Sequence, residues 1–539
     1  MTKHLKIIVF AFFCFYVSSV LQLYGKDVKS VDEMTFADKL RAEADRLSKT
    51  EMQSIFQFMG DDLFEGRTPG TRGGELAEKY VRSILKLFNI DPYGGGYLQP
   101  FNLLGFTTHS LKVNAGGREL HFNNDVLGTF MGKDDNFDIR GDAVFIGYGT
   151  RTALWDWDDY KDADVSGKFV IARVNDPGMF IDDIFEGKIL TYFGRWTYHI
   201  EEARRKGARA ILLIHTDESA GYGWNVVQNS WSGEEVYLES SLTGNMEFTG
   251  WMREEVLRNI LDSKNISLEK LYSDSLKRDF KPVPLGFDIH ISGNRSRRGI
   301  MNNNVVGFIP GRSDKSIVIS AHIDHLGMIP GKEGDNILNG AIDNGTAVAA
   351  MMMTARILKK FQTDLHFSVI ILAPNAEEAN LLGSKYFVAN CDRNKIIANI
   401  NFESTPVWGK SGSLIGVGAR FSTMEAMLKE IAAEEGVDYR YFSMSNQGFF
   451  FRSDQFPFAM ADIPSLWIST GEDDDSGENL YRKFWQERYH TVKDEYDPEW
   501  RLDGMRQTIR YALLLIERIN REQKAPAWSR KLTFPTFSD

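Results

Sequence analysis

The stretch "SAHIDHLG", Ser320 to Gly327, places two histidines and an aspartate within four residues. It follows "SIVI", an apolar run typical of a buried strand. Imidazole nitrogens and carboxylate oxygens are common zinc ligands, and a carboxylate beside a ligand histidine can instead orient its ring. His322, Asp324 and His325 are therefore candidates for a metal site at the end of a strand.

Further ligand-type side chains lie along the chain. Glu377 and Glu378 follow the apolar run "FSVIILAPNA", and Glu403 follows "IIANINF". Asp343 lies just before an expected helix, and His490 lies in a loop before the last helix. In open α/β sheets the carboxyl ends of the strands meet at one edge, where ligands bind. Carboxylates that converge there repel one another unless a cation lies between them. Because mixed nitrogen and oxygen ligands suit zinc, the sequence predicts one or two zinc ions.

Each of these features has an ordinary structural explanation when it is taken alone. A histidine at a strand end is usually a hydrogen-bonded structural residue, and adjacent glutamates usually lie in solvent. An aspartate before a helix is usually a cap. Only their joint occurrence at successive strand ends favours a metal site.

Strand-like and helix-like runs alternate through the C-terminal half of the chain. Strands are expected at "SIVISAH", "LHFSVIILAP", "IIANINFES" and "DIPSLWIST". Helices are expected at "GTAVAAMMMTARILKKF", "LLGSKYFVANC", "ARFSTMEAMLKEIAAEEG" and "GMRQTIRYALLLIERINRE". This alternation predicts an α/β fold with a mostly parallel sheet that helices cover on both faces.

The rest of the chain divides into segments with different sequence patterns. Residues 31–59 form one charged helical stretch by their pattern, and a Gly/Pro-rich loop in "GDDLFEGRTPGTRGG" leads into another helix. Short β-like runs such as "DAVFIGYG" and "GKFVIARV" mark residues 111–290. We interpret these residues as a β-rich domain inserted into the domain that the flanking segments form. The expected catalytic domain comprises residues 26–110 and 291–525, and residues 526–539 form a C-terminal tail.

The N-terminus has the pattern of a signal peptide, expected over residues 1–25. Lys3 and Lys6 precede an apolar run from Ile7 to about Val20. A membrane anchor is the alternative, but a spanning helix needs about 20 apolar residues. The sequence therefore predicts a secreted or periplasmic protein without stable membrane insertion. Cleavage would leave Cys391 as the single cysteine, which excludes an internal disulfide and is expected to be a buried thiol.

Six stretches in order resemble the zinc peptidases of the M28 family, which include aminopeptidases. They are "SAHIDHLG", "NGAIDNGTAVAA", "APNAEEANLLGSKYF", "NFES", "RSDQFPF" and "YHTVKD", and "DLFEGRTPGTRGGELAEKYV" is similar to the N-terminal segment of the family. Residues 111–290 resemble the protease-associated (PA) domain that is often inserted in these enzymes. The resemblance implies the sheet of the zinc-aminopeptidase (phosphorylase/hydrolase-like) type.

The resemblance also implies the metal ligands, for two zinc ions per chain. They are His322, Asp343, Glu378, Glu403 and His490, with Asp343 bridging the ions. The family usually has aspartate at the position of Glu403, and glutamate is one methylene longer. Glu403 could reach the metal with a shifted backbone or bind differently.

Three further roles follow from the same resemblance. Glu377 is the implied general base, Asp324 would orient His322 from outside the metal shell, and Tyr489 could donate to the oxyanion of the tetrahedral intermediate. His325 receives no role in zinc binding and is expected to be structural.

The expected function is that of a secreted zinc-dependent exopeptidase, an aminopeptidase acting on peptides. A glutaminyl-cyclase-like acyltransferase with one zinc and a non-catalytic binding protein on a peptidase scaffold are the alternatives. A carboxypeptidase or dipeptidase preference also stays open. The net charge of −11, from 74 acidic and 63 basic residues, argues against a nucleic-acid partner.

Overall fold

The computed structural model describes residues 34–132, 134–231, 233–239, 245–474, 476–529 and 532–535. The expected signal peptide lies outside these residues. Within them, no helix is both long and apolar enough to cross a bilayer.

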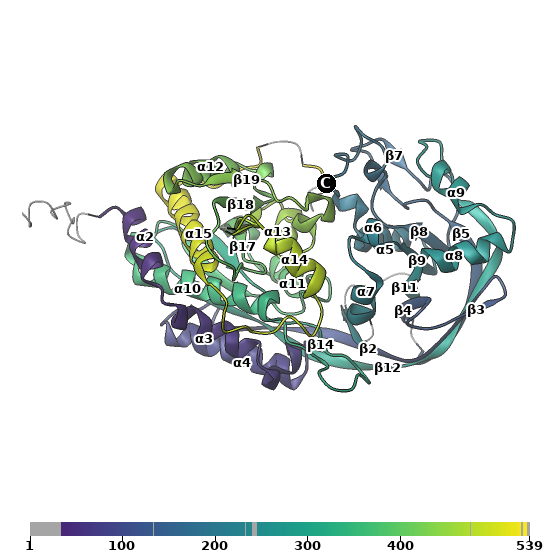
Figure 1. Cartoon of the computed structure of the whole chain (residues 1–539), viewed down its shortest axis with the longest axis horizontal. Helices are drawn as coiled ribbons and strands as arrows, with labels where there is room; N and C mark the ends of the chain where they lie inside the picture. Colours follow the sequence, from purple (N-terminus) through teal and green to yellow (C-terminus); the bar gives the residue numbers. More distant parts are fainter. Residues whose placement is uncertain are drawn as a thin grey trace, which may run out of the picture.

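Two packed units make up the chain (Figure 1). The inserted lobe comprises residues 116–282, and the main domain comprises the described residues on either side of it. The helices of the main domain are α2 (Phe36–Arg46), α3 (Lys49–Met59), α4 (Arg72–Leu87), α10 (Ala347–Lys360), α11 (Leu382–Asn390), α12 (Met424–Glu435), α13 (Gln455–Met460), α14 (Leu480–Glu487) and α15 (Asp503–Glu522).

The sheet of the main domain has the order β19-β18-β20-β17-β13-β16-β12. Its strands are β12 (Val283–Ile309), β13 (Ser316–Ser320), β16 (Ser368–Ala373), β17 (Ile396–Asn401), β18 (Ser413–Val417), β19 (Asp438–Arg440) and β20 (Ser465–Thr470). In addition, β1 (Asp91–Pro92) pairs with β12. β14 (Gly327–Met328) and β15 (Ile337–Leu338) form a separate pair. The four strands expected from the sequence, β16, β13, β17 and β20, are adjacent and mutually parallel. The predicted α/β class with a helix-covered sheet is confirmed.

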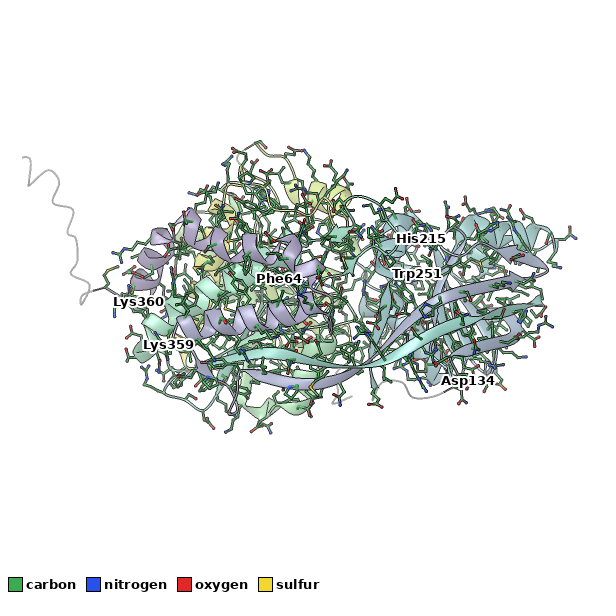
Figure 2. All side chains as sticks on the ribbon, turned by 90° about the horizontal axis from the view of Figure 1, so that it is seen from below. Phe64, Asp134, His215, Trp251, Lys359 and Lys360 are labelled. Carbon is green, nitrogen blue, oxygen red and sulfur yellow. The ribbon has the colours of Figure 1, made fainter. Side chains whose placement is uncertain are left out.

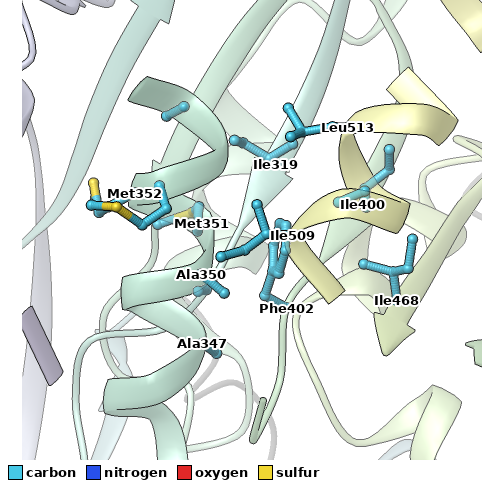
Figure 3. Packing of buried hydrophobic residues seen from close by; sticks show 14 of the residues in the cluster. Ile319, Ala347, Ala350, Met351, Met352, Ile400, Phe402, Ile468, Ile509 and Leu513 are labelled. Carbon is cyan, nitrogen blue, oxygen red and sulfur yellow. The ribbon is translucent and has the colours of Figure 1, made fainter. Parts of the chain in front are cut away.

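Helices cover both faces of this sheet because its strands are apolar on both sides. In β13, Ile317 and Ile319 pack into the core under α10 and α15, whereas Val318 packs into the core under α11 and α13 on the opposite face. Figure 3 shows the first of these cores, where methionines and alanines of α10 meet Ile509 and Leu513 of α15 above the strands.

The N-terminal helical stretch forms two helices rather than one. Helix α2 ends at Arg46, and Ser48 caps α3. The Ser48 side chain accepts a hydrogen bond from the backbone N–H of Glu51, and the carboxylate of Glu51 accepts one from the backbone N–H of Ser48. This reciprocal capping box satisfies amides that a continuous helix would have paired internally, and the chain turns there.

Two long strands connect the units. β2 (Leu98–Ala115) and β12 pair antiparallel from Leu98 opposite Val305 to Ala115 opposite Ile289. Figure 2 shows both strands crossing from the main domain into the lobe. The boundaries expected at residues 110/111 and 290/291 lie inside these strands.

The sheet continues from β12 into the lobe in the order β5-β8-β9-β11-β4, and the lobe has hydrophobic cores of its own. Its strands are β3 (Arg118–Leu120), β4 (Val126–Phe130), β5 (Asn136–Phe145), β6 (Arg151–Thr152), β7 (Trp157–Asp158), β8 (Phe169–Arg173), β9 (Ala210–His215), β10 (Glu234–Leu238) and β11 (Phe248–Arg253). Its helices are α5 (Trp196–Arg205), α6 (Asp217–Ala220), α7 (Trp224–Trp231), α8 (Glu254–Asp262) and α9 (Leu268–Asp274). β5, β8, β9 and β11 run parallel, and α5 to α7 lie toward the main domain in Figure 1.

Candidate metal centre

The polar residues singled out in the sequence meet at one edge of the main sheet. His322 follows β13, Glu377 and Glu378 follow β16, and Glu403 follows β17. Because these strands are parallel, their carboxyl ends open into the same space. Asp343 lies in a π-helical turn, Ala341–Thr346, before α10, and His490 follows α14.

These side chains form two groups that could each hold a metal ion. The first contains His322, Glu377 and Glu403, and the second contains His325, Asp343, Glu378 and His490, with the ligand atoms of each group within 4.8 Å of one another. Asp343 connects the groups, since its Oδ1 lies 3.3 Å from His322 Nε2 and its Oδ2 lies 3.4 Å from His490 Nε2. This is the position of a bridging carboxylate.

His322 directs its Nε2 into the first group. That atom lies 3.4 Å from Glu403 Oε1 and 3.9 Å from Glu377 Oε2. On the other side of the ring, Nδ1 lies 3.2 Å from the backbone oxygen of Asp324. The carbonyl orients the ring with Nε2 facing the carboxylates.

The carboxylate of Asp324 fixes the two glutamates through their backbone. Its Oδ1 accepts from the amide of Glu377 at 3.0 Å and its Oδ2 accepts from the amide of Glu378 at 3.2 Å. The distance from Asp324 Oδ1 to His322 Nδ1 is longer, 3.7 Å. Asp324 therefore positions the Glu377–Glu378 loop as well as the histidine beside it.

His325, which was expected to take no part in zinc binding, lies inside the second group. Its Nδ1 is 2.7 Å from Glu378 Oε1, and its ring packs edge-on against His490. Its Nε2 is buried and has no hydrogen-bond partner among the described residues. Its place beside a ligand carboxylate could not be read from the strand that precedes it, because Glu378 comes from the neighbouring strand end.

Glu403 is held by buried hydrogen bonds that connect it, through Ser453 before α13, to Asn401 at the end of β17. Ser453 Oγ donates to Glu403 Oε2, and Asn401 Nδ2 donates to Ser453 Oγ at 2.9 Å. The other carboxylate oxygen of Glu403 faces His322. The longer side chain thus keeps one oxygen in the first group.

Arg67 is a residue of the site that sequence reasoning missed. Its fully buried guanidinium donates to five backbone carbonyls, those of Met59, Ile323, Asn339, Gly340 and Asp343. It thereby ties together the loops that carry the histidines and the bridging aspartate. Its only signal in the sequence was its place in the stretch "EGRTPG", and that stretch indicates a turn rather than a functional residue.

Asp494, four residues after His490, was also missed. Its carboxylate accepts from the amides of Ile342 and Asp343, both at 3.0 Å, and its backbone oxygen accepts from Ala341. It holds the turn that presents Asp343. The repeated aspartates in "HTVKDEYD" are the signal that could have drawn attention to it.

The cluster attracts positive charge strongly. Burial alone would lower the pKa of His322, but the carboxylates of Glu377 and Glu403 raise it well above its ordinary value. Burial opposes ionisation of Asp343, yet His322 and His490 hold the pKa of Asp343 well below its usual range. Burial raises the pKa of Glu377, and the neighbouring carboxylates Glu378 and Glu403 add to this effect.

The donor set fits zinc. His490 Nε2 is buried, has no hydrogen-bond partner among the described residues, and faces Asp343 and Glu378 oxygens at 3.4 and 3.2 Å. His322 Nε2 faces carboxylates in the same way. Two imidazoles with converging carboxylates are the nitrogen and oxygen mixture that zinc prefers.

The family comparison coincides with this part of the chain. Residues 304–514 match the model described as peptidase family M28. This segment is an M28 peptidase domain. All of the candidate ligands lie within it, whereas Arg67 and the inserted lobe lie outside the matched residues. No curated protein sequence matches the chain.

Solved structures resemble the M28 domain and the lobe together. An aminopeptidase from Aneurinibacillus sp. strain AM-1 gives a TM-score of 0.53 at 15% identity, over 92% of this chain and 99% of its own. A peptidase M28 precursor from Shewanella amazonensis gives 0.49 at 15%, over 93% and 99%, and a zinc aminopeptidase from Bacillus subtilis gives 0.47 at 16%, over 90% and 96%. At these identities the likeness concerns the fold alone.

The lobe contacts the M28 domain directly at a candidate ligand. Asn229 Nδ2 donates to the backbone oxygen of His490 at 2.9 Å, and Ser230 Oγ lies 3.2 Å from His490 Nδ1. Tyr489 stacks on the His490 ring at a centroid distance of 3.7 Å. Helix α7 of the lobe therefore helps to orient His490, the last of the candidate ligands along the chain.

A cavity of about 250 Å³ lies between the M28 domain and the lobe. His322, Asp343, Glu377 and Tyr489 line it from the M28 domain. Arg195, Trp196, Tyr222 and Ser230 line it from the lobe. The candidate metal centre thus forms one wall of a space that both units enclose.

Proposed function

We propose that this chain is a secreted zinc-dependent exopeptidase, an aminopeptidase that removes N-terminal residues from peptides. The observation that carries the proposal is the pair of ligand groups joined by Asp343, with Glu377 beside them, in the cavity of an M28 domain. The residues present suit two zinc ions.

The two ions would share Asp343 and take their other ligands from different loops. His322, Asp343 and Glu403 would hold the first ion, and Asp343, Glu378 and His490 would hold the second. When bound, zinc lowers the pKa of water and polarises a carbonyl oxygen.

Glu377 is the proposed general base. It lies in the first group, 3.9 Å from His322 Nε2, on a loop whose backbone Asp324 fixes. Its carboxylate would take a proton from the attacking water and pass it to the leaving amine. Since Asp324 binds the amides of both glutamates, the two adjacent carboxylates can keep separate tasks.

Tyr489 is the proposed donor to the oxyanion of the tetrahedral intermediate. It lines the cavity and stacks on His490, so its ring is held beside the second group. A phenol O–H in a partly buried site donates a stronger hydrogen bond than it would in water.

Hydrolysis of aminoacyl-nitroanilides by the zinc-loaded protein tests this function. Free N-terminal substrates should be cleaved and N-acetylated ones should not. Glu377→Gln should lower kcat by about 10²- to 10⁴-fold, because a general base contributes that much, while zinc content stays at the wild-type level. Equal activity of the variant would reject the assigned mechanism.

The same preparation separates the cyclase alternative. Incubation with a peptide that begins with glutamine should release free glutamine if the chain is a peptidase. Formation of the pyroglutamyl peptide without cleavage, with one zinc per chain, would favour the acyltransferase.

A further inference from the structure

Two arginines that line the cavity have no carboxylate partner among the described residues. Arg195 precedes α5 in the lobe, and Arg452 follows the turn Phe449–Phe451 in the M28 domain. Within the described part of the chain, no carboxylate oxygen lies within 4.0 Å of either guanidinium and neither donates a hydrogen bond. Arg195 Nε is buried without any acceptor.

The buried arginines of the described chain each donate to at least one oxygen of the protein, although the Nε of Arg518 also lacks a partner there. Arg67 donates to five carbonyls, and Arg518 pairs with Glu430 and Glu434. Arg295 donates to carbonyls of the loop after β4. Arg195 and Arg452 are half-buried, and within the described part of the chain the buried Nε of Arg195 has no acceptor. A buried N–H without an acceptor is costly, so this atom, together with the lack of a facing carboxylate among the described residues, favours an acceptor that comes from outside the chain.

The two guanidinium groups face the same space from opposite units. Arg452 lies over the rings of Phe449 and Trp485, at 5.2 and 5.4 Å, and over Tyr222 of the lobe at 5.5 Å. These aromatic contacts hold its charge at the interface. Arg195 and Arg452 line the same cavity, and burial, followed by the positive charge of Arg452, lowers the pKa of Arg195.

Their position relative to the reacting atoms is also defined. Both line the cavity that contains His322, Glu377 and Tyr489. An anion held between the arginines would therefore lie beside the metal centre rather than at a distant surface.

We infer that Arg195 and Arg452 form a carboxylate-binding subsite that anchors the substrate next to the scissile bond. This inference rests on the proposed peptidase function. The planar fork of arginine binds a carboxylate through paired hydrogen bonds, and one guanidinium from each unit would engage one oxygen or both. Neutral peptides would leave both cations without an acceptor.

The carboxylate has two possible sources in a peptide. It is the C-terminal group of a very short peptide, or it is the side chain of an aspartate or glutamate near the scissile bond. Both present the same chemistry to the arginines, so matched substrates must separate them.

The test compares substrate pairs that differ by one charge. Leucyl-leucine with a free or an amidated C terminus examines the first source. Leucyl-glutamyl-leucinamide and leucyl-glutaminyl-leucinamide examine the second. We expect kcat/KM to be about 10- to 100-fold higher for the charged member of at least one pair, the range given by hydrogen bonds to charged groups.

Binding is measured separately from turnover. Isothermal titration calorimetry of the zinc-loaded protein uses leucyl-leucine with a reduced scissile bond, with free or amidated C terminus, and the matched tripeptide pair with the same replacement. The charged ligand of the same pair should bind with a Kd lower by a similar factor.

Variants assign the effect to the arginines. Arg195→Met and Arg452→Met should each bring the charged-to-neutral ratios of kcat/KM and Kd close to one, and Arg195→Lys should keep part of the preference. Circular dichroism melting identifies a variant that fails to fold, and the wild-type ratios remain decisive in that case.

The outcomes distinguish the two proposals. Ratios near one for both pairs in the wild-type protein, in turnover and in binding, would overturn the subsite. Ratios that persist in both methionine variants would overturn it as well. Preferential binding of charged ligands without hydrolysis of any substrate would leave the subsite standing and reject the peptidase function.

Discussion

The main domain and the inserted lobe both reach the cavity, but they hold their side chains differently. In the main domain, Asp324, Asp494 and Arg67 fix the ligand loops through buried bonds to the backbone. In the lobe, Ser230 near the end of α7 makes one side-chain hydrogen bond, and the Arg195 guanidinium before α5 makes none to the described residues.

This difference separates two tasks. Metal and proton chemistry depends on geometry held to a fraction of an ångström, and the main domain supplies that by redundant buried bonding. Recognition of a peptide tolerates adjustable groups, which short helices on a second unit can provide. The following variants test how far the division holds.

The largest effect should come from His322→Ala. The variant should lose one bound zinc, and the rate of nitroanilide hydrolysis should fall by about 10³-fold or more, since the charge stabilisation from a metal is worth several kcal/mol. Metal analysis by atomic absorption alongside the rate checks this. Full zinc content in the variant would contradict the assignment of His322.

Arg67→Met should be the most destabilising change that touches no ligand side chain. Removing five donors leaves buried carbonyls unpaired, and the free energy of unfolding should fall by about 3 kcal/mol or more. Arg195→Met is the matched control from the lobe and should change stability by less than about 1 kcal/mol. Urea unfolding followed by circular dichroism measures both variants. Equal losses of unfolding free energy would contradict the proposed difference between the main domain and the lobe.

His325→Ala should have an intermediate effect. Because His325 Nδ1 contacts the carboxylate of the proposed ligand Glu378, zinc affinity should fall by about 10- to 100-fold, with activity largely restored at saturating zinc. Competition with a chelator measures the affinity. If His325→Ala matched His322→Ala in lost zinc and lost rate, His325 would be a ligand in its own right.

Ser230→Ala should have the smallest effect. One hydrogen bond from the lobe to His490 contributes about 0.5–1.5 kcal/mol, so zinc affinity should fall by about 2- to 10-fold. The same chelator competition applies, with Ser219→Ala elsewhere in the lobe as the control. A loss larger than that of His325→Ala would make the lobe part of the metal centre itself.

Much of the fold was predictable because its signals are local. The runs that became β13, β16, β17 and β20 are mostly apolar, as strands buried on both faces must be, and His322, the two glutamates Glu377 and Glu378, and Glu403 follow the first three of them. The break at Ser48 was also readable, since a serine followed three residues later by glutamate is a capping box. The helical periodicity on both sides of it concealed the turn.

The remaining parts of the site depend on contacts between distant segments. Arg67 acts on carbonyls more than 250 residues away, and no local pattern marks an arginine whose acceptors are backbone atoms of other loops. His325 gains its contact only when the neighbouring strand places Glu378 beside it. Ser230 and Arg195 matter only because the lobe closes against the main domain.

The long ladder of β2 and β12 sets the spacing of the two units. Its pairs run from Leu98 opposite Val305 to Ala115 opposite Ile289, with a single irregularity at Asn294/Arg295. Each residue along a strand adds about 3.3 Å, so two extra residues in each strand would carry the lobe about 7 Å along the ladder. That shift exceeds the length of any hydrogen bond, so it would break the contacts between the lobe and the metal centre. The length of the ladder therefore sets the size of substrate that can contact the lobe and the metal centre at the same time.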